Sequence, residues 1–269
     1  MDVQNFLELF IKELEGNRDL QSYYRLLNSK QRFLWRKAYL EQRLTYVDSH
    51  LGKPAGTIWD AGCGYGTTAI FLALNGYEVL GNTLEFYFDK INPRLDFWSK
   101  YGNLDKLKFE YADLYDMPNS DSRYDAIIAQ DTLHHLEPAN DAVGIFYRSL
   151  KQDGRLIVAE ENGGNVFISL KNFRKRGFKR TIAYYDERLK KSIVMGNENA
   201  QSLEKWKQLM KVCGLTLLDF EYIRFLPPVF FNSRNYQRII GWEQQTGKKT
   251  TLLREILFFG INFTAVKPS

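Results

Sequence analysis

Apolar residues recur at helical spacing through the first fifty residues. Over the first turns they stand three or four positions apart, at Val3, Phe6, Leu7, Phe10, Ile11 and Leu14. Residues at that spacing share one face of an α-helix, so an amphipathic helix is predicted up to about Gly16. The same spacing continues over residues 20–51 and predicts a second helical stretch before the first strand.

From residue 57 onward, short apolar runs alternate with helical patterns. Strands are predicted at residues 57–60, 77–81, 108–111, 124–129, 155–160 and 215–225, and helices at 68–75, 139–150 and 202–213. Residues 86–107 are predicted to hold a helix interrupted at Pro93 and then a polar loop. Strands that alternate with helices form parallel sheets covered on both faces. The fold class is therefore predicted to be α/β, with a doubly wound sheet.

The first strand runs into a glycine turn, in the sequence T-I-W-D-A-G-C-G-Y-G from Thr57 to Gly66. Glycine suits a sharp passage from strand to helix because its backbone adopts torsions that a Cβ forbids. A ligand lying against such a turn also leaves no room for side chains. A dinucleotide site would place its glycines as G-x-G-x-x-G, whereas here the third glycine comes one residue early. The spacing argues against a pyrophosphate cofactor.

The D-A-G-C-G-Y-G sequence closely resembles the first motif of the class I S-adenosylmethionine-dependent methyltransferases. The resemblance implies a Rossmann-like sheet of seven strands, the last of which, at 256–266, is antiparallel. It implies a methyltransferase domain over 53–269, with insertions at about 161–200 and 226–253, preceded by a helical cap at 1–52. In the family such leading helices often shape the substrate pocket, which makes Tyr23, Tyr24, Trp35 and Arg36 possible lining residues; alternatively, their aromatic rings pack this layer onto the sheet.

The resemblance also implies a set of residues that bind the cofactor, S-adenosyl-L-methionine. The glycine turn is expected under its methionine part, with Asp60 holding the amino group. After the second strand the chain departs from the pattern, because Thr83 stands where an acid usually holds the ribose, and Glu85 follows two residues later. Asp113 matches the adenine-binding acid, although aspartate after a strand is also a common turn former. The full predicted set is Asp60, Ala61, Gly62, Cys63, Gly64, Gly66, Thr83, Glu85, Asp113, Leu114 and Gln130.

Candidate catalytic residues follow the fourth strand, in the sequence Q-D-T-L-H-H-L from Gln130 to Leu136. Ligands of open α/β sheets bind outside the carboxyl ends of the strands, so this loop faces the same crevice as the glycine turn. Its L-H-H-L part resembles a signature of small-molecule and lipid methyltransferases. An imidazole titrates near neutral pH, so His135 or His134 is predicted to be a general base that Asp131 orients. The alternative is that both histidines cap the next helix and pack on the sheet.

Basic residues are concentrated in one of the insertions. The whole chain of 269 residues has a net charge of +5, yet residues 171–191 contain nine basic side chains and two acidic ones, a local charge of +7. Just before and within this segment, Val166, Phe167, Leu170, Phe173 and Phe178 approximate one apolar helical face. The pattern predicts a lid that selects an anionic or membrane-associated acceptor. The alternative is a solvated charged surface.

The composition excludes several classes of protein and leaves three candidate functions. No apolar run is long enough to span a membrane, and the first residues do not resemble a targeting signal, so a cytoplasmic location is expected. Two cysteines make no disulfide framework, and no residues have metal-ligand spacing, so no metal is predicted. The leading prediction is methyl transfer to a small-molecule or lipid-like acceptor, at a hydroxyl oxygen. The alternatives are a nucleic-acid methyltransferase or binder that uses the basic segment, and a non-catalytic relative that retains the cofactor pocket.

Overall fold

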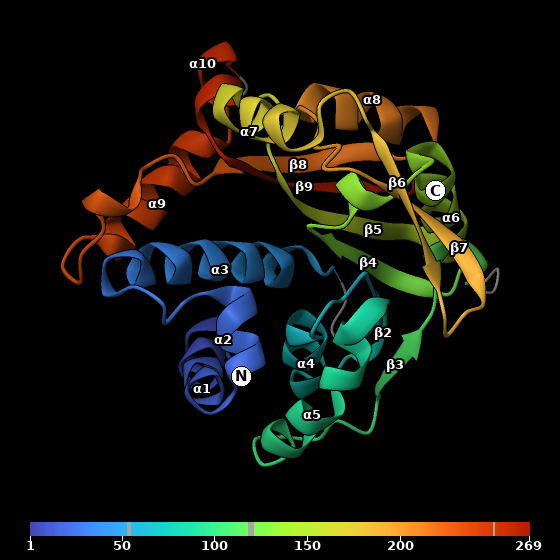
Figure 1. Cartoon of the computed structure of the whole chain (residues 1–269), viewed down its shortest axis with the longest axis horizontal. Coiled ribbons are helices and arrows are strands. Elements are labelled where there is room, and N and C mark those ends of the chain that lie inside the picture. Colours follow the sequence, from blue (N-terminus) through green and yellow to red (C-terminus); the bar gives the residue numbers. More distant parts are fainter. Residues whose placement is uncertain (53–54, 118–120, 250) are drawn as a thin grey trace.

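The computed structural model describes residues 1–52, 55–117, 121–249 and 251–269, without the side chains of Lys30, Gln31 and Glu85. One sheet of seven strands organises these residues (Figure 1). The strands, in chain order, are β1 (Thr57–Ala61), β2 (Glu78–Thr83), β3 (Leu107–Tyr111), β4 (Tyr124–Gln130), β5 (Leu150–Glu161), β8 (Thr216–Ile223) and β9 (Gly260–Val266).

The strand order across the sheet is β3-β2-β1-β4-β5-β9-β8. β1 to β5 pair in parallel, whereas β9 is antiparallel to both of its neighbours. The prediction of a Rossmann-like, doubly wound sheet with an antiparallel last strand is confirmed. Because the parallel strands share one direction, the carboxyl ends of β1, β2, β3 and β4 lie at the same edge, where a ligand site is expected.

Helices cover both faces of the sheet. The first hydrophobic core joins one face to α1 (Val3–Gly16), α3 (Lys30–His50), α4 (Thr67–Leu74) and α5 (Asn92–Trp98). The second core joins the other face to α6 (Ala139–Ser149) and α8 (Leu203–Val212). The central strands β1 and β4 are buried on both faces, as expected for a parallel sheet, whereas the edge strands β3 and β8 are partly exposed. In the described residues, no helix has the length and apolarity needed to cross a bilayer.

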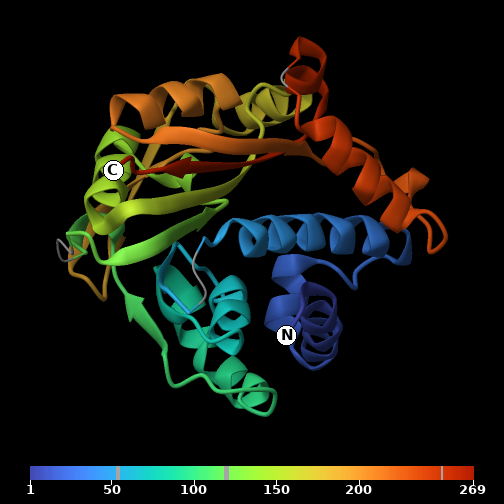
Figure 2. The same cartoon turned by 180° about the vertical axis from the view of Figure 1, so that it is seen from behind.

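The leading helices are three rather than two. The stretch predicted over residues 20–51 is broken, because α2 (Arg18–Tyr24) ends at Arg25, whose left-handed φ of 53° stops the helix before α3 begins. The helix predicted after residue 86 is a 3-10 turn, η1 (Glu85–Lys90), followed by the short α5. Figures 1 and 2, from opposite sides, both show α3 lying between the α1–α2 pair and the sheet.

The two insertions contain more regular structure than their patterns predicted. The first consists of α7 (Val166–Arg176) and a β-hairpin of β6 (Thr181–Asp186) and β7 (Lys191–Gly196). The second holds η4 (Pro228–Phe230) and α9 (Tyr236–Gly247), and α10 (Leu252–Leu257) follows it. The prediction that the last strand starts at residue 256 is wrong, because α10 continues to Leu257 and the strand starts at Gly260. Leucine and glutamate favour helix over strand, which explains the difference.

Candidate functional site

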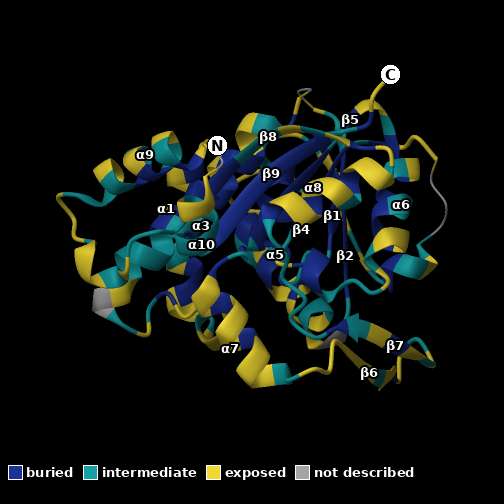
Figure 3. Ribbon diagram, turned by 90° about the horizontal axis from the view of Figure 1, so that it is seen from above, coloured by how far each residue is buried: buried dark blue, intermediate teal, exposed yellow. Residues whose placement is uncertain are grey.

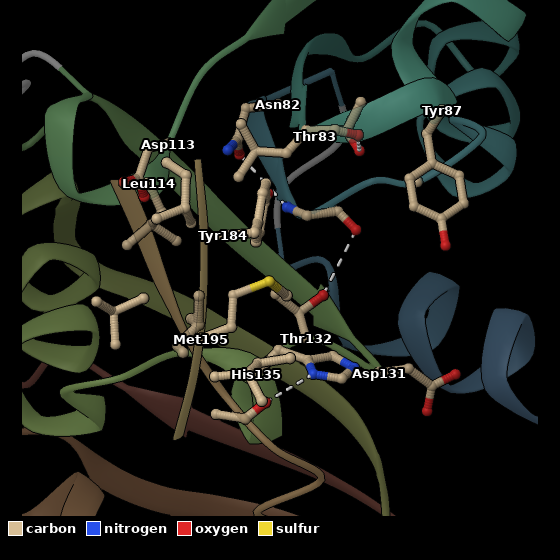
Figure 4. A pocket seen from close by; sticks show the side chains of 18 of the residues that line it. Asn82, Thr83, Tyr87, Asp113, Leu114, Asp131, Thr132, His135, Tyr184 and Met195 are labelled. Atoms are coloured by element: carbon tan, nitrogen blue, oxygen red, sulfur yellow. Dashed lines mark hydrogen bonds between the residues drawn. The ribbon is translucent and has the colours of Figure 1, made fainter. Parts of the chain in front are cut away.

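A cavity of about 480 Å³ opens at the carboxyl ends of the parallel strands (Figure 4). Its walls come from the glycine turn, the ends of β2, β3 and β4, helix α2 and the β6–β7 hairpin. Its lining residues include Tyr23, Gly62, Gly64, Asn82, Thr83, Asp113, Leu114, Gln130, Asp131, Thr132, His135, Tyr184, Ile193 and Met195. Sequence segments far apart in the chain thus meet around one space, which has the size of a small-molecule site.

Only two of the predicted turn glycines, Gly62 and Gly64, line the cavity. Gly64 has a φ of 54°, and a Cβ built on it would meet only the hydroxyl of Tyr23, at 3.8 Å. A Cβ on Gly66 would instead lie 2.7 Å from the ring of Phe109, so Gly66 is required for packing. Gly64 therefore leaves open the space in which a ligand would lie against the backbone. Ala61 and Cys63, also predicted to bind the cofactor, are not among the lining residues.

A buried arginine pins the end of the glycine turn. Arg94, 1% exposed, donates to the carbonyl of Tyr65 at 2.5 Å and to the hydroxyl of Thr67 at 2.8 Å. Its other nitrogens bind both carboxylate oxygens of Glu13, each at 2.7 Å. Because Glu13 belongs to α1, this paired contact connects the N-terminal helices to the turn. The turn is preorganised by residues that the sequence pattern did not single out.

Two polar groups beside the turn keep hydrogen-bonding capacity. Asp60 is 2% exposed and does not line the cavity, and its Oδ2 is buried without a partner. Burial raises the pKa of Asp60 to about 7. Gln130 does line the cavity; its Oε1 accepts from Thr68 at 2.8 Å, while its buried Nε2 has no partner. Buried polar groups are normally paired, so the unpaired Gln130 Nε2 in the cavity wall, together with the space above Gly64, fits a polar ligand on the turn.

The end of β2 presents an amide and a hydroxyl. Asn82 Oδ1 accepts from Trp59 Nε1 at 2.8 Å, and Asn82 Nδ2 donates to the Ala112 carbonyl at 3.1 Å. This side chain therefore braces β1 and β3, and only its position at a strand end could have identified it from the sequence. Thr83, predicted to contact the ribose, is 5% exposed and lines the cavity. The side chain of Glu85, the other predicted ribose contact, lies outside the described residues.

Asp113 and Leu114, predicted to contact adenine, both line the cavity. A lysine of the hairpin already contacts this aspartate: Lys191 Nζ lies 2.5 Å from Asp113 Oδ2 and 2.5 Å from Asp116 Oδ2. Asp113 Oδ1 accepts from the backbone of Tyr115 at 3.3 Å. Any amino group of a ligand would therefore share the Asp113 carboxylate with Lys191.

The two histidines have different environments. His134 is 5% exposed, does not line the cavity, and its Nδ1 lies 2.5 Å from Glu160 Oε2. Glu160 Oε1 also accepts from the backbone N–H groups of Thr132, at 2.9 Å, and Leu133, at 2.7 Å. Burial alone would lower the pKa of His134, but the Glu160 carboxylate outweighs it and raises the pKa to about 9. His134 is consequently charged at neutral pH and fixes the loop after β4.

His135 lines the cavity. Its Nδ1 lies 3.2 Å from the carbonyl oxygen of Gly196, at the end of β7. A carbonyl only accepts, so Nδ1 carries the proton. Burial, and then the charge of His134, lowers the pKa of His135. The neutral ring therefore keeps Nε2 as its acceptor, the form that a general base requires.

Asp131 lines the cavity and forms an ion pair with α3. Its Oδ2 lies 2.6 Å from Arg43 Nη1, and the same guanidinium donates to the Ala159 carbonyl at 3.2 Å. Desolvation would raise the pKa of Asp131, but the charges of Arg43 and His134 and, more weakly, that of Arg224 outweigh it and lower the pKa. Asp131 is thus an anion held by Arg43, and no hydrogen bond between Asp131 and His135 is present.

The β6–β7 hairpin forms one wall of the cavity. Tyr184, Ile193 and Met195 line it, and Figure 4 shows Tyr184 and Met195 projecting from the hairpin toward the space near His135. Leu136 pairs with Met195 as an isolated antiparallel bridge. This apolar wall falls within the insertion predicted at about 161–200, although Ile193 and Met195 follow the basic segment 171–191. Its signal in the sequence was the two strand-like runs at 181–186 and 191–196, separated by a four-residue turn.

Apart from the buried Ile168, helix α7 leaves its apolar residues exposed, and much of its ribbon is coloured as exposed in Figure 3. Phe167 is 63% exposed and Phe173 is 45% exposed, while Phe178, just after the helix, is 92% exposed. The neighbouring Lys175 lines the cavity and pairs with Glu198. The first insertion therefore supplies the cavity wall through its hairpin and an exposed apolar surface through α7.

Comparisons with known proteins agree with this geometry. The methyltransferase domain family matches residues 59–158. The chain is 26% identical over 225 residues to phosphoethanolamine N-methyltransferase 3 of Arabidopsis thaliana, covering 80% of this chain and 42% of that protein. It is 29% identical over 130 residues to 27-O-demethylrifamycin SV methyltransferase of Amycolatopsis mediterranei, covering 46% of this chain and 47% of that protein. The chain thus spans less than half the length of these two relatives.

A solved structure of Burkholderia thailandensis 1,6-didemethyltoxoflavin-N1-methyltransferase has the same fold, with a TM-score of 0.52 and 14% identity, over 100% of this chain and 92% of that one. That structure contains 1,6-didemethyltoxoflavin and S-adenosylhomocysteine. At this identity the likeness concerns the fold alone.

Proposed function

On the premise that this chain belongs to the class I S-adenosylmethionine-dependent methyltransferases, we propose that it methylates a hydroxyl oxygen of a small-molecule or lipid-like acceptor. The observation that supports this proposal best is the position of His135. Its neutral ring stands in the wall of the same cavity that the glycine turn lines. A proton acceptor and a cofactor-sized space thus meet in one site.

Residues of this chain fit the cofactor. Gly64 leaves space against the backbone, and Gln130 Nε2 offers a buried donor without a partner. Thr83, Asp113 and Leu114 line the remaining part of the same cavity, where the ribose and adenine are expected. When bound, S-adenosylmethionine supplies a methyl group on a sulfonium, with a good leaving group. The protein therefore has to position the acceptor and remove its proton, and positioning alone is worth on the order of 7–11 kcal/mol.

We propose that His135 removes the proton from the hydroxyl group of the methyl acceptor. Its Nδ1–H is held by the carbonyl of Gly196, which fixes both the ring and the tautomer. His134 is excluded from this role because its pKa of about 9 keeps it protonated and because it lies behind the cavity wall. Asp131 is held by Arg43 and contributes a fixed negative charge at the cavity edge.

The apolar wall supports an acceptor with a hydrophobic part. Tyr184, Ile193 and Met195 face the cavity, and α7 exposes Phe167 and Phe173 beside basic residues. Aromatic and cationic side chains are satisfied together at an anionic lipid surface. We therefore extend the proposal to amphiphilic acceptors presented at such a surface, with the hairpin as the part of the insertion that contacts the acceptor.

The test is transfer of a labelled methyl group into fractions of a cell extract, including lipids in anionic and in zwitterionic vesicles. A labelled small molecule or lipid supports the proposal. Label in nucleic acid favours the basic segment as a nucleic-acid site. Binding of S-adenosylhomocysteine without any transfer indicates a non-catalytic cofactor-binding protein.

Once an acceptor is known, His135→Asn tests the base. The amide nitrogen of asparagine takes about the position of Nδ1 and can still donate to the Gly196 carbonyl, but the side chain accepts no proton at this pH, so turnover should fall by roughly 10²–10⁴. Affinity for S-adenosylhomocysteine should stay unchanged, because His135 is outside the predicted cofactor set. Because the pKa of His135 lies below its usual value of 6.5, turnover of the wild type should rise with pH only below about 6.5 and then level off. Turnover of the variant within a few-fold of wild type refutes the role.

A further inference from the structure

A strained turn follows β8 and directs the side chain of Arg224 toward helix α3. Arg224 follows the last residue of the strand and has a left-handed φ of 67°. The buried carboxylate of Glu243 holds this turn by accepting from the backbone N–H groups of Arg224, Phe225 and Leu226, at 3.3, 2.8 and 3.2 Å. Trp35 Nε1 also donates to the Leu226 carbonyl at 2.9 Å. Backbone strain of this kind persists only where the surroundings over-determine it, and it is concentrated at functional sites.

The guanidinium of Arg224 lies against two aromatic rings. Its Cζ is 4.5 Å from the ring centroid of Trp35 and 4.5 Å from that of Tyr39. Its Nε is buried and has no hydrogen-bond partner. Cation–π contacts orient a guanidinium but satisfy none of its N–H donors. The side chain is therefore fixed in place while donors remain available.

Arg36 lies near three other arginines, Arg25, Arg32 and Arg224, whose charges act on it. Arg36, one helical turn before Tyr39, donates to the carbonyl of Arg25 at the end of α2. Burial, and then the charges of Arg32, Arg25 and Arg224, lowers the pKa of Arg36. In the described part of the chain, none of the four forms an ion pair, and two carboxylates near Arg224, those of Asp131 and Glu243, are held by other groups. Four like charges without a counter-ion repel one another, and an anion would remove that cost.

This arginine cluster, defined as Arg25, Arg32, Arg36 and Arg224, does not line the cavity but is connected to its wall by a chain of side-chain contacts. Tyr39 lies between Arg224 and Arg43, whose Cζ is 5.1 Å from the same ring. Arg43 in turn pairs with Asp131 in the cavity wall. Figure 1 shows why these residues meet: α3 runs between α2 and the segment formed by the end of β8 and α9.

We propose that Arg36 and Arg224, supported by Arg25 and Arg32, bind the anionic group of the methyl acceptor, a phosphate or a similar oxyanion. The proposal rests on the proposed function, because the acceptor's reactive end must reach His135 while its anion lies on the α3 side of Asp131. A guanidinium recognises such oxyanions through paired, charge-assisted hydrogen bonds. The oxyanion belongs either to a free small molecule or to a lipid headgroup.

The first experiment titrates inorganic phosphate into the full chain by calorimetry at low ionic strength. Methionine keeps the length and packing of arginine without its charge. Arg36→Met and Arg224→Met should each weaken phosphate binding by at least about tenfold, as expected when a charge-assisted hydrogen bond is lost. The control is Arg234→Met, which removes the same charge from an exposed position in the second insertion and should leave binding within about twofold.

The second experiment repeats the comparison with vesicles of phosphatidylcholine containing phosphatidic acid. Vesicle binding that needs Arg36 and Arg224, without binding of free phosphate, supports the site and identifies a lipid headgroup as the source. Equal losses in all three variants, or no binding of either probe by the wild type, overturn the proposal.

Cofactor and acceptor readouts separate this proposal from the proposed function. S-adenosylhomocysteine should bind all variants like wild type, and phosphate should not displace it. Once methyl labelling has identified the acceptor, phosphate should inhibit methyl transfer in competition with that acceptor. If phosphate does not compete, the arginine cluster does not bind the acceptor's anionic group, and the proposal is overturned. If S-adenosylhomocysteine does not bind the wild type at all, the proposed function fails, whereas phosphate binding that depends on Arg36 and Arg224 would still stand.

Discussion

Replacing Gly64 with alanine separates the ligand-binding role of the glycine turn from its conformational role. The φ of 54° at Gly64 is unfavourable for any L-residue, so Gly64→Ala should lose about 1–2 kcal/mol of folding free energy. Gly76→Ala is a matched control, because Gly76 has a φ of 89°, lies away from the cavity and has no atom within 4 Å of the added Cβ. Each variant should therefore show a Tm lower by roughly 2–8 °C.

Only Gly64→Ala should lose affinity for the cofactor. Its added Cβ meets one protein atom, the Tyr23 hydroxyl at 3.8 Å, so the methyl group projects into the cavity where a ligand would contact the backbone. Displacing the ligand from that contact should weaken binding of S-adenosylhomocysteine more than tenfold, which is about 1.4 kcal/mol or more. Calorimetry gives the affinities and thermal melting the stabilities. Equal affinities in folded wild type and Gly64→Ala would refute the placement of the cofactor on the turn.

Two further predictions concern ion pairs. Because Glu160 raises the pKa of His134 from 6.5 to about 9, the pair stabilises the fold fully below pH 6.5 and progressively less as the pH rises through about 9. Glu160→Gln should lower Tm at neutral pH and flatten its fall toward alkaline pH, and a variant with the wild-type pH profile would contradict this account. Removing the lysine that shares Asp113, in Lys191→Met, should raise affinity for S-adenosylhomocysteine by about two- to fivefold, or about 0.4–1 kcal/mol. The control is Lys190→Met, which breaks only the exposed ion pair between Lys190 and Glu187. Weaker cofactor binding by Lys191→Met would contradict the prediction and show that the contact between Lys191 and Asp113 assists the cofactor instead.

The sequence predicted the sheet and the glycine turn because both depend on local patterns. Apolar runs bounded by glycine and helical spacing located the strands within a few residues, and the alternation of strand and helix indicated parallel pairing. The same kind of reasoning placed the start of the last strand too early, since the apolar run at 256–259 belongs partly to α10. It also did not predict the β6–β7 hairpin, because the many charged residues of this segment obscure the strand-like alternation of residues 181–186 and 191–196.

Within the site, the sequence identified residue types and the edge of the sheet where they gather, as for His134, His135 and Asp131. Only the tertiary structure distinguished the two histidines: Glu160, from the neighbouring strand, fixes one behind the cavity wall, while the hairpin carbonyl of Gly196 fixes the other within it. Adjacent residues in a chain share their sequence context but not their burial or their charged neighbours. A pKa and a tautomer depend on partners distant in sequence, so pattern alone does not determine them.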